Sequence, residues 1–391
     1  MKVSDRIAGL TGGGPDGWDL YRKARRMIAE GVSVTELTIG EHDVRTDPSI
    51  LEAMRASAAG GHTGYAALPG TDALRTAVAA RIEARTGVPT SRRNVVITPG
   101  GQAALFAAHV VACDPGDRAL FIDPYYATYP GTIRAAGAIA VTVAAEAERD
   151  FRPDPAAIEA ALPARSILVN SPNNPTGVVY DRATLDGIGE VARAHDLWIV
   201  SDEVYDTQVW SGAHLSPRAL PGLAERTLVV GSLSKSHAMT GSRLGWLAGP
   251  EEAIAHAINL TTHTTYGVPG FVQDAGLFAL ARGEALETAI AAPFRRRHAL
   301  AMRVLSSAGV RVVPSTASMY VMADIRPTGL SGEAFADRLL DTHAIAVMPG
   351  ESFGRAAAGH LRIALTVADD RLDAALTTLA NFHNTLKRQA A

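Results

Sequence analysis

The chain has 391 residues, enough for two or three domains with a sizeable core, and its 47% hydrophobic and 20% charged content is typical of a globular enzyme. Its 37 basic and 40 acidic residues leave a formal net charge of −3, which argues against nucleic acid or an anionic membrane as a partner. The single cysteine, Cys113, excludes an intrachain disulfide; since neither a signal peptide nor a transmembrane run is predicted, we expect a cytoplasmic location.

Strands and helices are predicted to alternate from residue 95 onward. Short apolar runs that end in turn-forming residues predict strands at 95–98, 119–123, 139–144, 167–170, 197–200, 227–230 and 244–248. Helical patterns lie between most of them, at 101–113, 125–136, 155–162 and 183–195. This rhythm predicts an α/β domain of three layers, in which a mostly parallel sheet is covered by helices on both faces.

The pattern changes after the basic segment that begins at Pro293. Strands are predicted at 312–313, 319–322, 345–347 and 361–365, with helices at 334–343 and from 370 onward. We therefore expect a second, smaller α+β domain whose boundary lies near residue 293.

Ligands of open parallel sheets bind outside the carboxyl ends of the strands, so the residues at those ends are candidates for function. Gly101 and Gln102 follow the first strand and open a helix, whose N-terminal N–H groups are suited to bind an anion. Tyr126 follows the second strand and offers an aromatic face to a flat ring. An unliganded tight turn and ordinary aromatic packing remain the alternatives for these two positions.

The next two strand ends carry an amide and an acid. Asn174 lies in a segment bracketed by prolines, which either holds the amide rigidly or forms a purely structural loop. Asp202 follows a buried strand, where a lone charge is costly, so it requires a cationic partner such as a protonated pyridine nitrogen. Tyr205 lies three residues further on.

The segment 229–249 contains the most informative residues. Lys235 stands between two serines at the end of a strand, and Arg243 follows eight residues later. The amine is suited to bind the aldehyde of a phosphorylated cofactor covalently, while the hydroxyls and the guanidinium are suited to bind the dianion. A solvated Ser-Lys-Ser loop is the alternative for this segment alone. Five successive strand ends carry groups that complement one another, and this combination favours a cofactor-binding site over five unrelated loops.

The motifs SPNNPTG, SDEVY and SLSKSHAMTGSRLGW resemble those of the class I/II pyridoxal-phosphate-dependent aminotransferases of fold type I. The match runs in the order of the family from Tyr65 to Leu361-Arg362-Ile363. The resemblance implies the large sheet domain over 41–290 and a small domain built from both chain ends, with residues 1–40 as N-terminal arm and part of that domain and 291–391 as the rest.

The resemblance also implies individual roles. Lys235 would carry pyridoxal 5'-phosphate covalently, Asp202 would pair with its ring nitrogen, Tyr205 and Asn174 would bind its ring oxygen, and Tyr126 would stack on the ring. The phosphate would be held by Gly101, Gln102, Ser232, Ser234 and Arg243, with Tyr65 reaching it from the second subunit of a homodimer. Arg362 would bind the substrate α-carboxylate and Gly40 would close over it. No metal is implied.

Within the family, longer stretches such as 194–205 and 324–330 resemble the arginine–pyruvate transaminases, which implies transfer of the amino group of L-arginine or another amino acid to pyruvate. Glu41 and Asp43 are candidates for binding a guanidinium, although a solvated turn explains them equally well. The chain departs from the family at His42 and Val44, where proline and an aromatic are common. Aspartate-specific members of one subgroup carry a lysine where Gln102 stands.

Several alternatives remain open at this point. An aspartate or aromatic aminotransferase and a β-lyase would share Lys235, Asp202 and Arg243. The sensor half of a transcription regulator would need a DNA-binding module, for which there is no room before Trp18 and no basic patch. An inactive structural relative would bind no cofactor.

Overall fold

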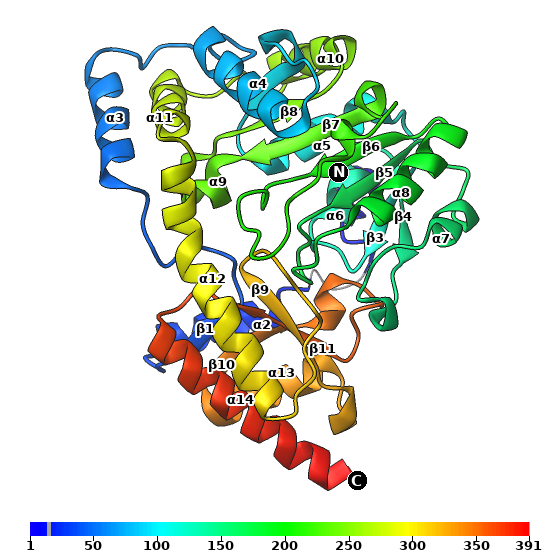
Figure 1. Ribbon diagram of the computed structural model, residues 1–391, viewed down its shortest axis with the longest axis vertical. Coiled ribbons are helices and arrows are strands. Elements are labelled where there is room, and N and C mark those ends of the chain that lie inside the picture. Colours follow the sequence, from blue (N-terminus) through cyan, green and yellow to red (C-terminus); the bar gives the residue numbers. More distant parts are fainter. Residues whose placement is uncertain (14–16, 391) are drawn as a thin grey trace.

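The computed structural model describes residues 1–13 and 17–390, and contains a seven-stranded and a four-stranded sheet (Figure 1). The large sheet has the order β2-β8-β7-β6-β5-β3-β4, in which β8 is antiparallel to both of its neighbours and the other pairs are parallel. Its strands are β2 (Val95–Thr98), β3 (Arg118–Asp123), β4 (Ile139–Ala144), β5 (Ser166–Asn170), β6 (Trp198–Asp202), β7 (Thr227–Ser232) and β8 (Gly245–Ala248).

Both faces of the large sheet are covered by helices, because successive side chains of a strand point to opposite faces. Leu168 and Val200 face a core that contains α5 (Gly101–Ala112), α6 (Tyr129–Ala135) and α10 (Glu251–Thr262). Ile167 and Ile199 face the opposite way, toward α8. The helices of that second face are α4 (Asp72–Thr86), α7 (Pro155–Ala160), α8 (Arg182–Ala194) and α11 (Gly270–Ala281), and α3 (Pro48–Ala59) packs on α11.

The small sheet joins segments from the two ends of the chain. Its order is β1-β10-β11-β9, formed by β1 (Thr35–Leu37), β10 (Ile345–Pro349), β11 (His360–Ala364) and β9 (Tyr320–Asp324). The helices α2 (Asp19–Ala29), α13 (Gly332–His343) and α14 (Asp369–Ala390) contribute to its core. The long helix α12 (Gly283–Ser307) runs from the large sheet's side of the molecule to this core (Figure 1).

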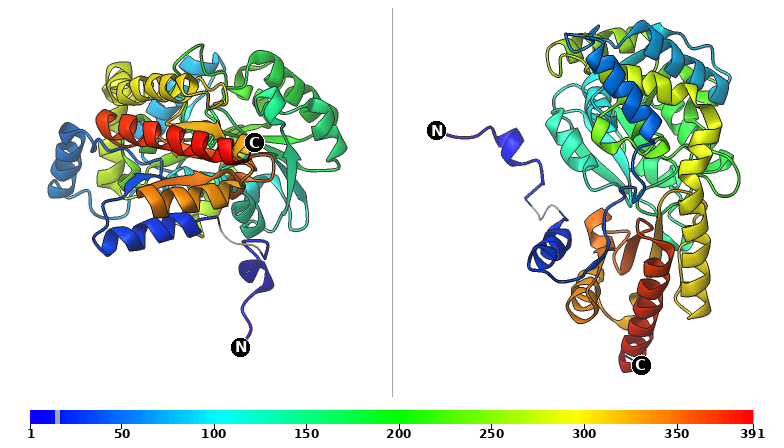
Figure 2. Two further views of the ribbon diagram at one scale, coloured as in Figure 1. Left: turned by 90° about the horizontal axis from the view of Figure 1, so that it is seen from below. Right: turned by 90° about the vertical axis from the view of Figure 1, so that its left-hand side faces the viewer.

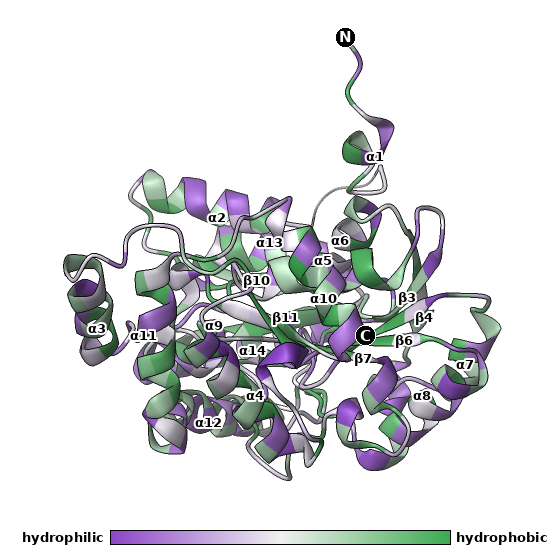
Figure 3. Cartoon of the chain, turned by 90° about the horizontal axis from the view of Figure 1, so that it is seen from above, coloured by the Kyte–Doolittle hydropathy of each residue, from purple (hydrophilic) through white to green (hydrophobic). Residues whose placement is uncertain are grey.

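The hydropathy of the residues follows this arrangement in layers. The strands of the large sheet are mostly hydrophobic, whereas outer helices such as α2 carry hydrophilic and hydrophobic residues in turn (Figure 3). The short helix α1 (Asp5–Ala8) belongs to an N-terminal segment that extends from the body of the molecule, and none of its residues is buried (Figure 2). Across residues 1–13 and 17–390, no helix has the length and apolarity needed to span a membrane.

Two predicted elements differ from those observed. The helix predicted to begin at Tyr125 begins at Tyr129, because the N–H of Tyr125 binds the carbonyl of Phe353 at 2.9 Å and because Pro130 occupies the first helical turn. The strand predicted at 312–313 is only an isolated bridge between Val312 and Ala323. The strands predicted from 95 to 248 are present, each within one or two residues of its predicted ends.

Candidate active site

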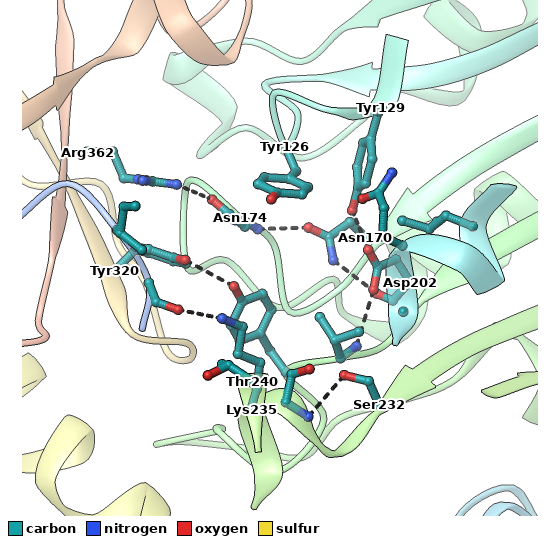
Figure 4. A pocket seen from close by; sticks show the side chains of 18 of the residues that line it. Tyr126, Tyr129, Asn170, Asn174, Asp202, Ser232, Lys235, Thr240, Tyr320 and Arg362 are labelled. Atoms are coloured by element: carbon teal, nitrogen blue, oxygen red, sulfur yellow. Dashed lines mark hydrogen bonds between the residues drawn. The ribbon is translucent and has the colours of Figure 1, made fainter. Parts of the chain in front are cut away.

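A cavity of about 220 Å³ lies at the carboxyl ends of β5, β6 and β7, next to the small sheet (Figure 4). It brings together every residue predicted to bind the cofactor or the α-carboxylate except Tyr65, whereas the candidate guanidinium partners Glu41 and Asp43 are not part of its lining. The predicted residues that line it are Gly40, Gly101, Gln102, Tyr126, Asn174, Asp202, Tyr205, Ser232, Ser234, Lys235, Arg243 and Arg362. The rest of the lining includes Trp18, Tyr129, Asn170, Thr240 and Tyr320, which the sequence did not single out.

Lys235 projects into the cavity from the short helix α9 (Leu233–Ser236), which follows β7 directly. The hydroxyl of Ser232 caps this helix by accepting the N–H of Ser234 at 3.2 Å. The Lys235 amine donates to the carbonyl of Gly40. Burial lowers the pKa of the Lys235 ammonium below 10.5. A buried amine that releases its proton more easily is suited to act as a nucleophile and as a base.

Asp202 is a buried carboxyl at the end of β6 that lacks a cationic partner within the described residues. It accepts the hydroxyl of Tyr129 at 2.7 Å and the N–H of Val204 at 3.3 Å. The side-chain amide of Asn170 donates to the Asp202 carbonyl at 3.0 Å. Burial raises the pKa of the Asp202 carboxyl to about 6. A buried acid with a raised pKa fits a protonated pyridine nitrogen, which would return its pKa to a lower value.

Donors for an anion come from the first turn of α5 and from Arg243. Gly101 and Gln102 form the first turn of α5, and the φ of the preceding Gly100 is 80°. A Cβ at Gly100 would lie 2.3 Å from a guanidinium nitrogen of Arg243, so glycine permits this close approach. Within the part of the chain that the structure describes, Arg243 forms no ion pair, and Nη1 donates to the carbonyl of Thr240 at 2.8 Å. These donors fit a phosphate dianion.

Arg362 is a buried cation whose guanidinium carbon lies 4.4 Å from the ring centroid of Tyr320 and 4.3 Å from that of Phe353. Nη1 donates to the side-chain oxygen of Asn174 at 2.9 Å, and Nη2 donates to the carbonyl of Thr38. Nε has no partner among residues 1–13 and 17–390. Burial lowers the pKa of the Arg362 guanidinium below 12.5. A buried arginine without an acid partner fits an incoming carboxylate.

Gln102 and Tyr65 are the two predicted phosphate-binding residues whose side chains do not face the phosphate donors of the same chain. The side-chain amide of Gln102 is bound by the hydroxyls of Thr132 at 2.6 Å and Thr128 at 3.0 Å, which leaves its backbone N–H for an anion. Tyr65 is 90% exposed, and its ring packs edge-on against Tyr266 at a centroid distance of 5.2 Å. Tyr65 therefore lies on the surface of the same chain, outside the cavity.

The comparison with protein families identifies the class of the chain. The sequence model described as "Aminotransferase class I and II" matches residues 32–379, and the chain belongs to this family. Family members use pyridoxal 5'-phosphate and act on amino acids and oxo acids, so the chain is a pyridoxal-phosphate-dependent transaminase. The family, the fold class and the cofactor that the sequence motifs imply are confirmed.

Comparisons with individual proteins show which aminotransferases the chain resembles. The chain is 40% identical over 383 residues to the arginine–pyruvate transaminase of Pseudomonas aeruginosa, covering 97% of this chain and 98% of that one. It is 36% identical over 365 residues to the aspartate/prephenate aminotransferase of Thermus thermophilus, with 92% and 93% covered. The solved structure of the T. thermophilus aspartate aminotransferase with maleate is 33% identical, has a TM-score of 0.91 and covers 98% of this chain and 100% of that one.

Proposed function

We propose that the chain transfers the α-amino group of L-arginine, or of another amino acid without a side-chain carboxylate, to pyruvate. The cations that line the cavity are Lys235, Arg243 and Arg362. If these three serve the cofactor carbonyl, the cofactor phosphate and the α-carboxylate, no cation among the described residues of this chain that line the cavity is left for a second carboxylate. This distribution of charge supports the proposal, together with the similarity to a relative named for arginine and pyruvate.

Each residue has a role in this proposal. Bound pyridoxal phosphate supplies the electron sink that makes the substrate Cα–H bond acidic. Arg362 clamps the α-carboxylate and so fixes the orientation of that bond. The amine of Lys235 would accept the proton from the substrate Cα and pass it to the cofactor carbon that was the aldehyde. With the cofactor bound, Asp202 would hold a proton on the ring nitrogen, Tyr205 and the amide nitrogen of Asn174 would donate to the ring oxygen, and Tyr126 would cover the ring.

Of the two acids that were candidates for a guanidinium partner, one is already paired. The Asp43 carboxylate accepts both terminal nitrogens of Arg297, at 2.8 and 2.7 Å. Glu41 is exposed, and its carboxylate accepts the hydroxyl of Thr240, a residue of the cavity wall, at 3.0 Å. Glu41 is therefore the acid that we propose for binding the side chain of arginine.

The variant Glu41→Gln is expected to raise the KM for arginine by about tenfold or more, because a charge-assisted hydrogen bond to a guanidinium contributes about 1.5–3 kcal/mol. The KM for alanine should stay unchanged in the same variant, since alanine has no group that reaches Glu41. Steady-state rates with pyruvate as acceptor measure both constants. An equal rise for the two donors would reject the assignment of Glu41.

The proposal also predicts the preference of the wild-type protein. With pyruvate as acceptor, kcat/KM for arginine should exceed that for aspartate by at least about 100-fold, because a buried carboxylate without a cation is strongly disfavoured. Aspartate turnover equal to or above that of arginine would reject the substrate assignment. Release of ammonia without a 2-oxo acid would instead indicate the β-lyase alternative.

A homodimer with active sites at the interface and a cytoplasmic location are part of the proposal, as is the division into residues 1–40, 41–290 and 291–391. The exposed aromatics Tyr65 and Tyr266, and the exposed Val3 and Ile7 of the N-terminal segment, support an interface. In such a dimer Tyr65 would reach the phosphate of the other subunit. Sedimentation of the purified protein at micromolar concentration tests this, and a monomer that retains full activity would contradict it.

A further inference from the structure

Tyr320 lines the cavity and contacts two of its functional groups, one on a strand of the small sheet and one just after a strand of the large sheet (Figure 4). It is the first residue of β9 in the small sheet and is buried. Its neighbours are Arg362 on β11 and Tyr205, which follows β6 of the large sheet. Neither the motifs nor the roles proposed above assign anything to Tyr320.

The ring of Tyr320 contacts the guanidinium of Arg362. The 4.4 Å distance between the guanidinium carbon and the ring centroid is that of a close cation–π contact. Because no carboxylate pairs with Arg362 within the described residues, the aromatic rings and two oxygen acceptors hold the guanidinium without neutralising its charge. The guanidinium therefore stays positively charged and able to bind a carboxylate that enters the cavity.

The hydroxyl of Tyr320 lies 3.1 Å from that of Tyr205, and the two rings meet edge to face at 5.9 Å. Burial and the neighbouring Tyr320 raise the pKa of the Tyr205 hydroxyl well above 10, so it keeps its single proton. If Tyr205 uses that proton to bind the cofactor's ring oxygen, then Tyr320 has to donate to Tyr205. The hydrogen bonds then run in one direction, from Tyr320 through Tyr205 to the cofactor.

Gly40 leaves the space that Tyr320 occupies. A Cβ at Gly40 would lie 1.7 Å from the Tyr320 hydroxyl, a distance that no side chain tolerates. The carbonyl of the same glycine accepts the amine of Lys235. The absence of a side chain at residue 40 therefore lets the Tyr320 hydroxyl reach Tyr205 beside the reactive lysine.

We propose that Tyr320 is a positioning residue with two separable tasks: its ring holds Arg362 for the substrate carboxylate, and its hydroxyl holds Tyr205 for the cofactor. The inference rests on the proposed function, because it needs Arg362 and Tyr205 in the roles given there. It adds a link between the two binding events, since one side chain from the small sheet contacts a residue that serves each of them.

The variants Tyr320→Phe and Tyr320→Leu separate the two tasks, because phenylalanine keeps the ring and leucine removes it. Two dissociation constants are measured: that of pyridoxal phosphate for the apoenzyme, by fluorescence, and that of propionate, a carboxylate without an amine, for the holoenzyme, by calorimetry. Tyr180→Phe, at a buried tyrosine outside the cavity, is the matched control and should change neither constant.

Tyr320→Phe is expected to weaken the binding of pyridoxal phosphate by about tenfold, the effect of one lost hydrogen bond, and to leave propionate within about threefold of wild type. Tyr320→Leu should in addition weaken propionate by about tenfold, through the lost cation–π contact. Equal losses of propionate affinity in both variants, or unchanged pyridoxal phosphate affinity in Tyr320→Phe, would overturn the inference. If Tyr320→Leu does not fold, the pyridoxal phosphate constant of Tyr320→Phe decides alone.

Failure of this inference and failure of the proposed function give different results. A wild-type protein that binds no pyridoxal phosphate or transfers no amino group rejects the proposed function. A wild-type protein that does both, with variants whose two constants do not separate, rejects only the role of Tyr320.

Discussion

Replacement of Lys235 by alanine is expected to lower transamination by at least about 10⁴-fold, because one amine serves as both the nucleophile toward the cofactor and the proton carrier at the substrate. Among the described residues that line the cavity, the alanine variant removes the only amine. The phosphate donors Gly101, Ser232 and Arg243 remain in place, so the variant should still bind pyridoxal phosphate non-covalently.

Steady-state turnover of arginine with pyruvate measures this loss. Lys387→Ala is the matched control, since Lys387 is an exposed lysine at the end of α14 and lies outside the cavity. It should keep wild-type activity. Turnover of Lys235→Ala above about a hundredth of wild type would contradict the role of this lysine, because a general base alone contributes at least about 10²-fold.

The variant Asp202→Asn is expected to turn over about 10³-fold more slowly than wild type, while its apoenzyme becomes more stable. The slower rate follows from the loss of the charge that keeps the cofactor's ring nitrogen protonated. The gain in stability follows from burial, because the pKa of this carboxyl rises from 3.8 to about 6 in the folded apoenzyme, which corresponds to about 3 kcal/mol at neutral pH.

The raised pKa of Asp202 also predicts how the stability of the apoenzyme changes with pH. Because the folded apoenzyme binds this proton more tightly than the unfolded chain, the contribution of the Asp202 carboxyl to stability is most favourable below pH 3.8 and is lost as the pH rises toward 6. Denaturant unfolding of both apoenzymes from pH 4 to 7.5 should show the asparagine variant gaining stability relative to wild type across this interval. A variant that is less stable than wild type at pH 7 would contradict the assignment of Asp202 as an unpaired buried acid.

Much of the large sheet could be predicted from the sequence, because each of its strands is a short apolar run with turn residues at its end. The order of the strands in the sheet could not be predicted in this way. The position of β8 between β2 and β7 pairs Trp246 with Gly231 of the preceding strand and with Ile97, which is far away in the sequence. β1 pairs with β10, and this pairing joins Thr35 to Ile345. The two residues are so far apart in the sequence that a pattern of neighbouring residues cannot predict the pairing.

The site was predictable where a polar residue ends an apolar strand, as at Asp202 and Lys235. Asn170 ends β5 in the same way, and the same rule would have found it. Tyr129 and Tyr320 carry no such signal, because each sits in an apolar segment where an aromatic residue is ordinary packing. Only the fold shows that the hydroxyl of Tyr129 binds Asp202 and that the Tyr320 hydroxyl meets Tyr205.

The central claim is that residue 235 holds the cofactor covalently. Incubation of the wild-type protein with pyridoxal phosphate, reduction with borohydride, and mass spectrometry of the proteolytic peptides test it most directly. The expected result is one modified peptide, with the added mass of the reduced cofactor on Lys235 and none on Lys2, Lys23 or Lys387. An unmodified Lys235 in protein that still transfers amino groups would contradict the claim.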